Sequence, residues 1–127
     1  YVEVIDDNPA TAKNFDIDAA VTKQRVLATS GPFITLAKGT VDATVQMKIQ
    51  GPSWMPVESV TLYTDGIEDT VLELKPYDND PVRYDGIVTL KNNAATWGVA
   101  VVRSESSPKP YLKAKPRAVS SVLYLTD

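Results

Sequence analysis

Short runs of β-branched residues, separated by turn residues, recur along most of the chain, and this rhythm restricts the fold more than any other feature. Val, Ile and Thr make up 34 of the 127 residues, and their branched side chains suit the pleated, half-buried surface of a sheet. Several runs alternate apolar and polar residues with the period of two that buries one face of a strand. The pattern predicts strands at residues 25–29, 33–37, 43–50, 57–64, 70–75, 87–90, 96–103 and 118–126.

Turn residues fill the gaps between these runs, at the intervals that a sandwich of two sheets requires. The strongest turn signals are Gly51-Pro52, Asp65-Gly66, Asp85-Gly86 and the stretch 79–81. No alternation of strands and helices is visible, so the predicted fold is all-β: an immunoglobulin-like antiparallel β-sandwich of about seven or eight strands. One short helix is expected over residues 16–24, with Asp16 or Asp18 as its N-cap and Ile17, Ala20, Val21 and Gln24 on one face.

The domain organisation follows from length and composition. With 127 residues, 43% of them hydrophobic, the chain is long enough to bury one core without disulfides or metals. We expect residues 16–127 to form a single sandwich domain and residues 1–15 to be a linker or an edge strand from a preceding domain. Because the sequence opens with Tyr1, we interpret it as a piece of a longer polypeptide.

Alternation along the runs also predicts which side chains face the core. Positions two apart on one strand point to the same side of the sheet. The residues expected to point inward are Val60, Leu62, Leu72, Leu74, Val88, Leu90, Val99, Val101, Leu123 and Leu125.

The sequence contains neither cysteine nor histidine. Within these residues there is therefore no thiolate nucleophile or ligand, no imidazole base and no Ser-His-Asp arrangement. The formal charge of −3 gives no electrostatic case for nucleic acid or for an anionic membrane. The compartment stays open, because a chain without cysteine suits both reducing and oxidising environments.

Charge is unevenly distributed along the chain. Residues 58–85 contain eight acids and two bases, whereas residues 103–127 contain five bases and two acids. This polarity can orient the module on a catalytic domain or on a neighbouring subunit, although ordinary surface charge is the simpler interpretation. The basic residues Lys109, Lys113, Lys115 and Arg117 around Tyr111 fit a surface loop better than a nucleic-acid site.

One group of acids has the chemistry of a metal site. Asp78, Asp80 and Asp85, with Asn79, supply hard oxygen ligands of the kind that Ca²⁺ takes. Their spacing does not fit an EF-hand loop, because Pro81 and Val82 intervene. A solvated turn is the favoured interpretation, and the calcium site is the weaker alternative.

Three aromatic residues mark a candidate interaction surface. Trp54 lies between Pro52 and Pro56, in a loop rather than a strand, and Tyr77 and Tyr84 flank a polar loop. Exposed indole and phenol rings are platforms for sugars and anchors at protein interfaces. Core packing is the competing interpretation, and for Trp97, within a predicted strand, it is the preferred one. We expect the loop of residues 51–56 to be partly covered by another domain or to pack across the Ser30-Gly31-Pro32 turn.

Three stretches resemble one protein family. Residues 16–33 (DIDAAVTKQRVLATSGPF), 51–66 (GPSWMPVESVTLYTDG) and 115–127 (KPRAVSSVLYLTD) are similar, in order and spacing, to the region after the catalytic barrel in PHP (polymerase and histidinol phosphatase) metallohydrolases of the carbaryl-hydrolase-like branch. Gln24 stands where that family has Gly, and Ser121-Val122 where it has Asn-Pro. The histidine-rich barrel has no counterpart here, so the resemblance transfers no catalytic residue.

The resemblance implies a non-catalytic C-terminal β-sandwich that packs on the barrel of a metal-dependent hydrolase or mediates its assembly. It implies no cofactor in this segment and a divalent metal in the parent catalytic domain. The expected partners are that domain, in cis, and a neighbouring subunit, with no nucleic acid and no membrane. The alternative is a carbohydrate-binding or adhesin-like module that uses Trp54 and the tyrosines. An upstream His- and Asp-rich segment in the parent reading frame favours the first hypothesis, and a glycosidase or surface-anchor segment favours the second.

Overall fold

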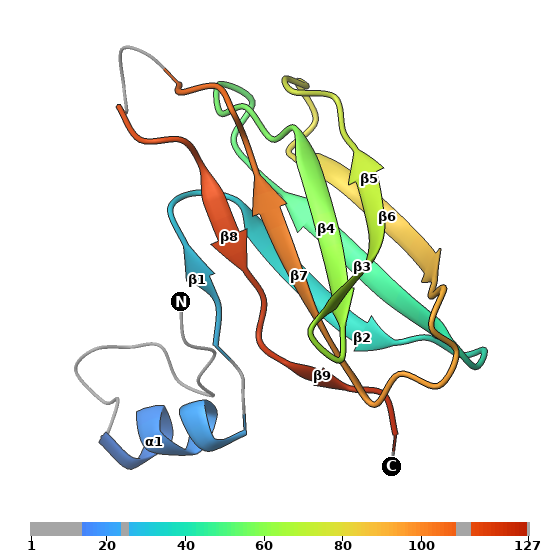
Figure 1. Cartoon of the computed structure of the whole chain (residues 1–127). Helices are drawn as coiled ribbons and strands as arrows, with labels where there is room; N and C mark the ends of the chain where they lie inside the picture. Colours follow the sequence, from blue (N-terminus) through green and yellow to red (C-terminus); the bar gives the residue numbers. More distant parts are fainter. Residues whose placement is uncertain (1–13, 24–25, 109–112, 127) are drawn as a thin grey trace.

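Two antiparallel sheets stack face to face in the computed structural model, which describes residues 14–23, 26–108 and 113–126. Figure 1 shows the larger sheet in front of the smaller one, with the single described helix standing to one side. The predicted all-β sandwich is therefore confirmed. Its described part contains nine strands rather than seven or eight, since the last predicted run divides into two short strands around Ser120 and Ser121.

The larger sheet combines strands from both ends of the chain. Its order is β1 (Ala28–Thr29), β8 (Arg117–Val119), β7 (Trp97–Arg103), β4 (Ser59–Thr64) and β5 (Ile67–Glu73), and β9 (Leu123–Tyr124) pairs with the other end of β7. The smaller sheet has the order β2 (Phe33–Lys38), β3 (Thr44–Gln50) and β6 (Val82–Thr89). All of these pairings are antiparallel.

The core lies between the sheets and is built from the alternate positions that face inward. On β4, Val60 and Leu62 are 1% and 2% exposed, as predicted. Val88 and Leu90 are also buried, and Leu72, Leu74, Leu123 and Leu125 pack against the core while partly exposed. The central side chains come from β3: Val45, Met47 and Ile49.

The predicted face of β7 is wrong. Ala100 and Val102 are fully buried, whereas Val99 and Val101 are half-buried on the opposite side. The register explains the result, since Val102 lies opposite the inward-facing Val60, and Ala100 lies opposite Leu62. Trp97 is on the same outer side as Val99 and is half-buried, so its assignment to the core is also wrong.

Two local predictions need correction as well. Asp85 and Gly86 do not form a turn, because both lie inside β6, paired with Lys48 and Met47 of β3. The helix α1 (Asn14–Thr22) begins before Asp16, and its Val21 is 52% exposed rather than on a buried face, although Ala20 is buried. Of residues 1–15, interpreted from the sequence as a linker or an edge strand, Asn14 and Phe15 belong to α1, and residues 1–13 lie outside the described residues, as does Gln24.

Candidate functional site

Two loops lie side by side at one end of the sandwich and carry most of the predicted interaction residues. We call residues 51–57 the Trp54 loop and residues 74–81 the Tyr77 loop. Backbone hydrogen bonds join them at both ends: the Gly51 N–H donates to the Pro81 carbonyl, and the Val57 N–H donates to the Pro76 carbonyl, each at 2.9 Å. The two loops therefore form one connected surface.

Arg83 of β6 forms hydrogen bonds to the backbone of the Trp54 loop. It occupies a β-bulge, because Ile49 pairs with Tyr84 and Gln50 pairs with Val82, which leaves Arg83 between them without a partner on β3. A bulge redirects the side chain of the extra residue. Here the Nη2 atom of Arg83 donates to the carbonyls of Pro52, at 2.6 Å, and Met55, at 3.2 Å.

The remaining nitrogens of that guanidinium are also enclosed. The Nε and Nη1 atoms of Arg83 are buried and have no hydrogen-bond partner among the described residues. Burying N–H groups of a charged side chain is costly. The two hydrogen bonds from Nη2 hold the loop that carries Trp54 in place. The burial of Nε and Nη1 without partners has a free-energy cost that these bonds offset in part.

Met55 of the Trp54 loop packs across the Ser30-Gly31-Pro32 turn. Met55 is 3% exposed, and a Cβ atom on Gly31 would clash with its sulfur. The predicted packing of this loop across the Ser30-Gly31-Pro32 turn is therefore confirmed, and Met55 makes the contact. Trp54 is 45% exposed, and the buried methionine beside it secures the loop.

Tyr77 shares the end surface with Trp54, and Tyr84 does not. Tyr77 is 54% exposed and lines a shallow cavity of about 300 Å³ with Ser53, Lys75, Asp78 and Asn79. Tyr84 lies on β6 and packs against the core, where a Cβ atom on Gly86 would lie 3.1 Å from its hydroxyl oxygen. The surface therefore contains two of the three predicted aromatic rings.

Asp78, Asp80 and Asp85, which the sequence offered as a calcium site, make separate interactions in the structure. Asp78 and Asp80 cap their own turn, since their carboxylates accept hydrogen bonds from the N–H groups of Asp80 and Val82 at 3.1 and 2.8 Å. Asp85 lies on β6 and forms an ion pair with Lys48 at 3.4 Å. Among the described residues, no three acidic side chains come together as a group able to hold a metal.

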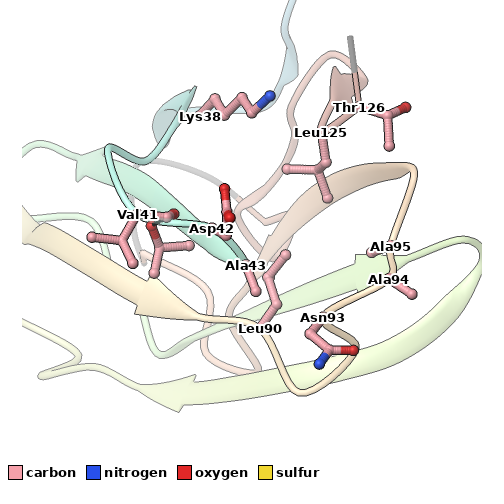
Figure 2. Close-up of a pocket in the computed structure, with 11 residues that line it drawn as sticks. Lys38, Val41, Asp42, Ala43, Leu90, Asn93, Ala94, Ala95, Leu125 and Thr126 are labelled. Carbon is pink, nitrogen blue, oxygen red and sulfur yellow. Dashed lines mark hydrogen bonds between the residues drawn. The ribbon is translucent and has the colours of Figure 1, made fainter.

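A second hollow lies at the opposite end of the sandwich (Figure 2). It has a volume of about 230 Å³ and lies between the turn after β2, the β6–β7 connection and the segment after β9. Ala43, Leu90, Ala95 and Leu125 supply apolar surface, and Lys38, Asp42, Asn93 and Thr126 supply polar groups. It is smaller than the pockets that usually hold drug-sized ligands.

Glu58 and Asp65, two of the eight acids in residues 58–85, hold neighbouring loops in place by hydrogen bonds. Glu58 accepts hydrogen bonds from Ser104 Oγ and from the N–H groups of Glu105 and Ser106 at 3.0 to 3.1 Å. Asp65 accepts from the N–H and hydroxyl groups of Thr96. Much of the negative charge in residues 58–85 therefore has a structural use.

Comparison with known proteins adds no relative. No protein family, curated protein or solved structure matches this chain. Within the described ranges, no helix has the length and apolarity needed to cross a membrane.

The sequence did not indicate the roles of Arg83 and Met55. Arg83 is one of two bases within residues 58–85, and this isolation was the available signal. Its partners, Pro52 and Met55, lie 31 and 28 residues away along the chain, so the contact could not be derived from local spacing.

Proposed function

We propose that this chain is a non-catalytic accessory module of a PHP-type metal-dependent hydrolase and that it docks on the catalytic domain of the same polypeptide. The Trp54 loop is the docking surface. The observation that carries this proposal is an indole that is 45% exposed on a loop fixed by Arg83 and by the buried Met55. A preorganised aromatic anchor loses little conformational freedom when it binds.

The resemblance to residues that follow a PHP barrel supplies the partner in this proposal. The catalytic metal is then held by the partner domain, and this module contributes a rigid surface that fixes the barrel's position. The parent reading frame gives a first test. An upstream segment with the His and Asp pattern of a PHP barrel is expected, and a surface-anchor segment there would contradict the proposal.

The substitution Trp54→Ala tests the anchor directly. In the 127-residue chain it is expected to lower the free energy of unfolding by only about 1 kcal/mol, because nearly half of the residue is already in water. Association with the separately produced catalytic domain should weaken by about tenfold or more, as for a central aromatic anchor. Isothermal titration calorimetry measures this association.

Val41→Ala is the matched control, since Val41 is 67% exposed and lines the hollow at the other end of the sandwich. It should leave the association unchanged. A large loss of stability on Trp54→Ala would instead assign the indole to the fold, and unchanged association would remove it from the docking surface.

A carbohydrate-binding module is the second candidate. It is favoured by the adjoining cavity, where Tyr77 lies beside Ser53, Asp78 and Asn79, since sugars are bound by aromatic faces together with polar side chains. Binding to a glycan panel that disappears with Trp54→Ala or Tyr77→Ala would establish this function in place of docking.

The non-catalytic part of the proposal has its own test. Phosphomonoester, phosphodiester and aryl-ester substrates are incubated with the chain and with Mn²⁺, Zn²⁺ or Fe²⁺. No turnover is expected above that of the metal alone. Turnover that scales with this protein after removal of contaminating enzymes would contradict it.

A further inference from the structure

The outer face of the larger sheet carries an apolar surface that no described element covers. The outward-pointing row Val119, Val101, Thr61 and Val71 crosses β8, β7, β4 and β5 at one level. Val119 and Val71 are 40% and 43% exposed. Figure 1 shows this face open toward the viewer, with α1 beside the sheet rather than in front of it.

Two larger side chains close over the centre of the row. Arg103 of β7 donates a hydrogen bond from Nη2 to the Tyr63 hydroxyl at 3.1 Å, and its guanidinium carbon lies 5.9 Å from the centre of that ring. Thr61, between them on the outer face, is consequently only 4% exposed. The contact between Arg103 and Tyr63 therefore orders the centre of this face. Aromatic residues extend the face toward β9, where Trp97 of β7 lies opposite the exposed Tyr124.

Charge changes sign across the same face. In the next row, Arg117 of β8 and Arg103 of β7 lie at one side, followed by Ser59 of β4 and then Glu73 of β5. Arg117 and Glu73 are both exposed. Basic side chains therefore lie on the β8 and β7 side of this face, and the acidic Glu73 lies on β5 at the opposite side.

We infer that this outer face binds a second copy of the same chain. A two-fold axis that runs parallel to the strands, between β7 and β4, places β8 of one copy over β5 of the other and β7 over β4. Arg117 then faces Glu73 of the second copy, and Val119 faces its Val71. The outer pairs of the two rows, Arg117 with Glu73 and Val119 with Val71, are therefore complementary across the axis, as an isologous interface requires.

The expected contact is weak. Four strands spaced about 4.8 Å apart, with a spread of about 20 Å along each strand, offer a face of roughly 400 Å² in projection. Two such faces bury an accessible area near about 1,000 Å², which is the lower limit for specific interfaces. The dissociation constant of the dimer is therefore expected to lie between about 1 µM and about 1 mM. The Trp54 loop is a separate surface, so this inference does not depend on the proposed docking function.

Sedimentation equilibrium of the 127-residue chain, from about 5 µM to about 1 mM, tests the inference together with charge reversal. The wild-type chain should show a reversible monomer–dimer equilibrium. Glu73→Arg and Arg117→Glu should each weaken dimerisation about tenfold or more, because the two-fold axis creates two like-charge contacts. The double variant Glu73→Arg with Arg117→Glu should recover most of the wild-type affinity.

Val71→Asp should abolish the dimer, and Ile87→Asp is its matched control. Ile87 is 61% exposed and lies on β6 in the smaller sheet, away from the proposed interface. Circular dichroism verifies that each variant is folded. A chain that is monomeric throughout the range, a double reversal that fails to restore association, or equal loss with Ile87→Asp would overturn the inference. Trp54→Ala should leave the dimer intact, which separates this outcome from failure of the docking proposal.

Discussion

Glycine at position 31 shows how one residue type makes room for a neighbour. Its φ angle of +150° is rarely adopted by other residues, and Met55 occupies the space where a Cβ atom would lie. The turn is further tied to β8, since the Ser30 N–H donates to the Arg117 carbonyl at 2.8 Å. Gly31 therefore links the fold of the N-terminal strands to the position of the Trp54 loop.

We expect Gly31→Ala to destabilise the chain by about 1 to 3 kcal/mol, because it adds backbone strain and displaces Met55. Part of this cost should disappear in a Met55→Ala background, where the methionine side chain is gone. A double-mutant cycle based on urea unfolding measures this coupling, which should exceed about 0.5 kcal/mol. Equal costs in both backgrounds would show that Gly31 and Met55 do not interact.

Gly86 is the residue at which local sequence rules failed. Asp-Gly is a strong turn signal, yet here the glycine lies within β6 opposite Met47. The tyrosine two residues before it leans over the glycine, with 3.1 Å between the hydroxyl oxygen and an added Cβ. Glycine in a strand often marks such a close approach. Only the three-dimensional neighbour distinguishes the two cases.

At the scale of elements, the alternation of apolar and polar residues located β3 and β4 well. β3 is the clearest case, with Val45, Met47 and Ile49 buried and Gln46 exposed between them. β7 lacks this contrast, because residues 99–102 are all apolar, and its inward face is decided by pairing with β4. The candidate site was predicted in part: the exposure of Trp54 follows from its loop, but the long-range contact of Arg83 does not.

Leu62→Ala tests the assignment of the inward face of β4. Leu62 is 2% exposed and belongs to the central cluster, so its truncation should leave a cavity and cost about 2 to 5 kcal/mol. Chemical denaturation followed by circular dichroism measures the change. Ile87→Ala, at an apolar side chain that is 61% exposed, should stay within about 0.5 kcal/mol. Similar effects for both would contradict the assignment.

At the scale of the whole molecule, several carboxylates stabilise the loops between strands by accepting hydrogen bonds from the loop backbone. Asp69 is the most central of them: it accepts from the N–H groups of Lys91 and Asn92 at 2.9 Å, and from the hydroxyls of Thr64 and Thr70. Burial raises the pKa of Asp69, but these hydrogen bonds together outweigh it and leave the pKa lowered. The edge strand β5 is thereby attached to the start of the β6–β7 connection.

The pKa values of three further carboxylates, Glu58, Asp65 and Glu105, are also lowered. Hydrogen bonds from Ser106, Glu105 and Ser104 lower the pKa of Glu58, and the Thr96 hydroxyl and backbone lower the pKa of Asp65. The pKa of Glu105 is lowered by its hydrogen bond and charge interaction with Lys115. All four carboxylates are therefore more acidic in the folded chain than in the unfolded chain.

The lowered pKa values of these four carboxylates predict that the folded chain loses stability in acid. A lowered folded-state pKa contributes stability that is fully present above the unfolded value, near about 4, and that is lost as pH falls through the folded value. The urea midpoint should thus be steady from about pH 7 to about pH 5 and fall below that. Asp69→Asn should lower the midpoint at neutral pH, and the difference from wild type should shrink toward pH 2. A difference that persists undiminished in acid would show that the Asp69 charge is not responsible.

The order of strands in the larger sheet also sets when the chain can fold during its synthesis. β8 lies between β1 and β7, so Ala28 meets its partner Val119 only after some ninety further residues have been made. Until then β1 lacks its partner and β7 has one open edge. Contacts so distant in sequence form slowly, and a ribosome adds these residues within seconds. The sandwich is therefore completed only after its C-terminal strands have left the ribosomal tunnel, and before that stage its unpaired strand edges are accessible to chaperones.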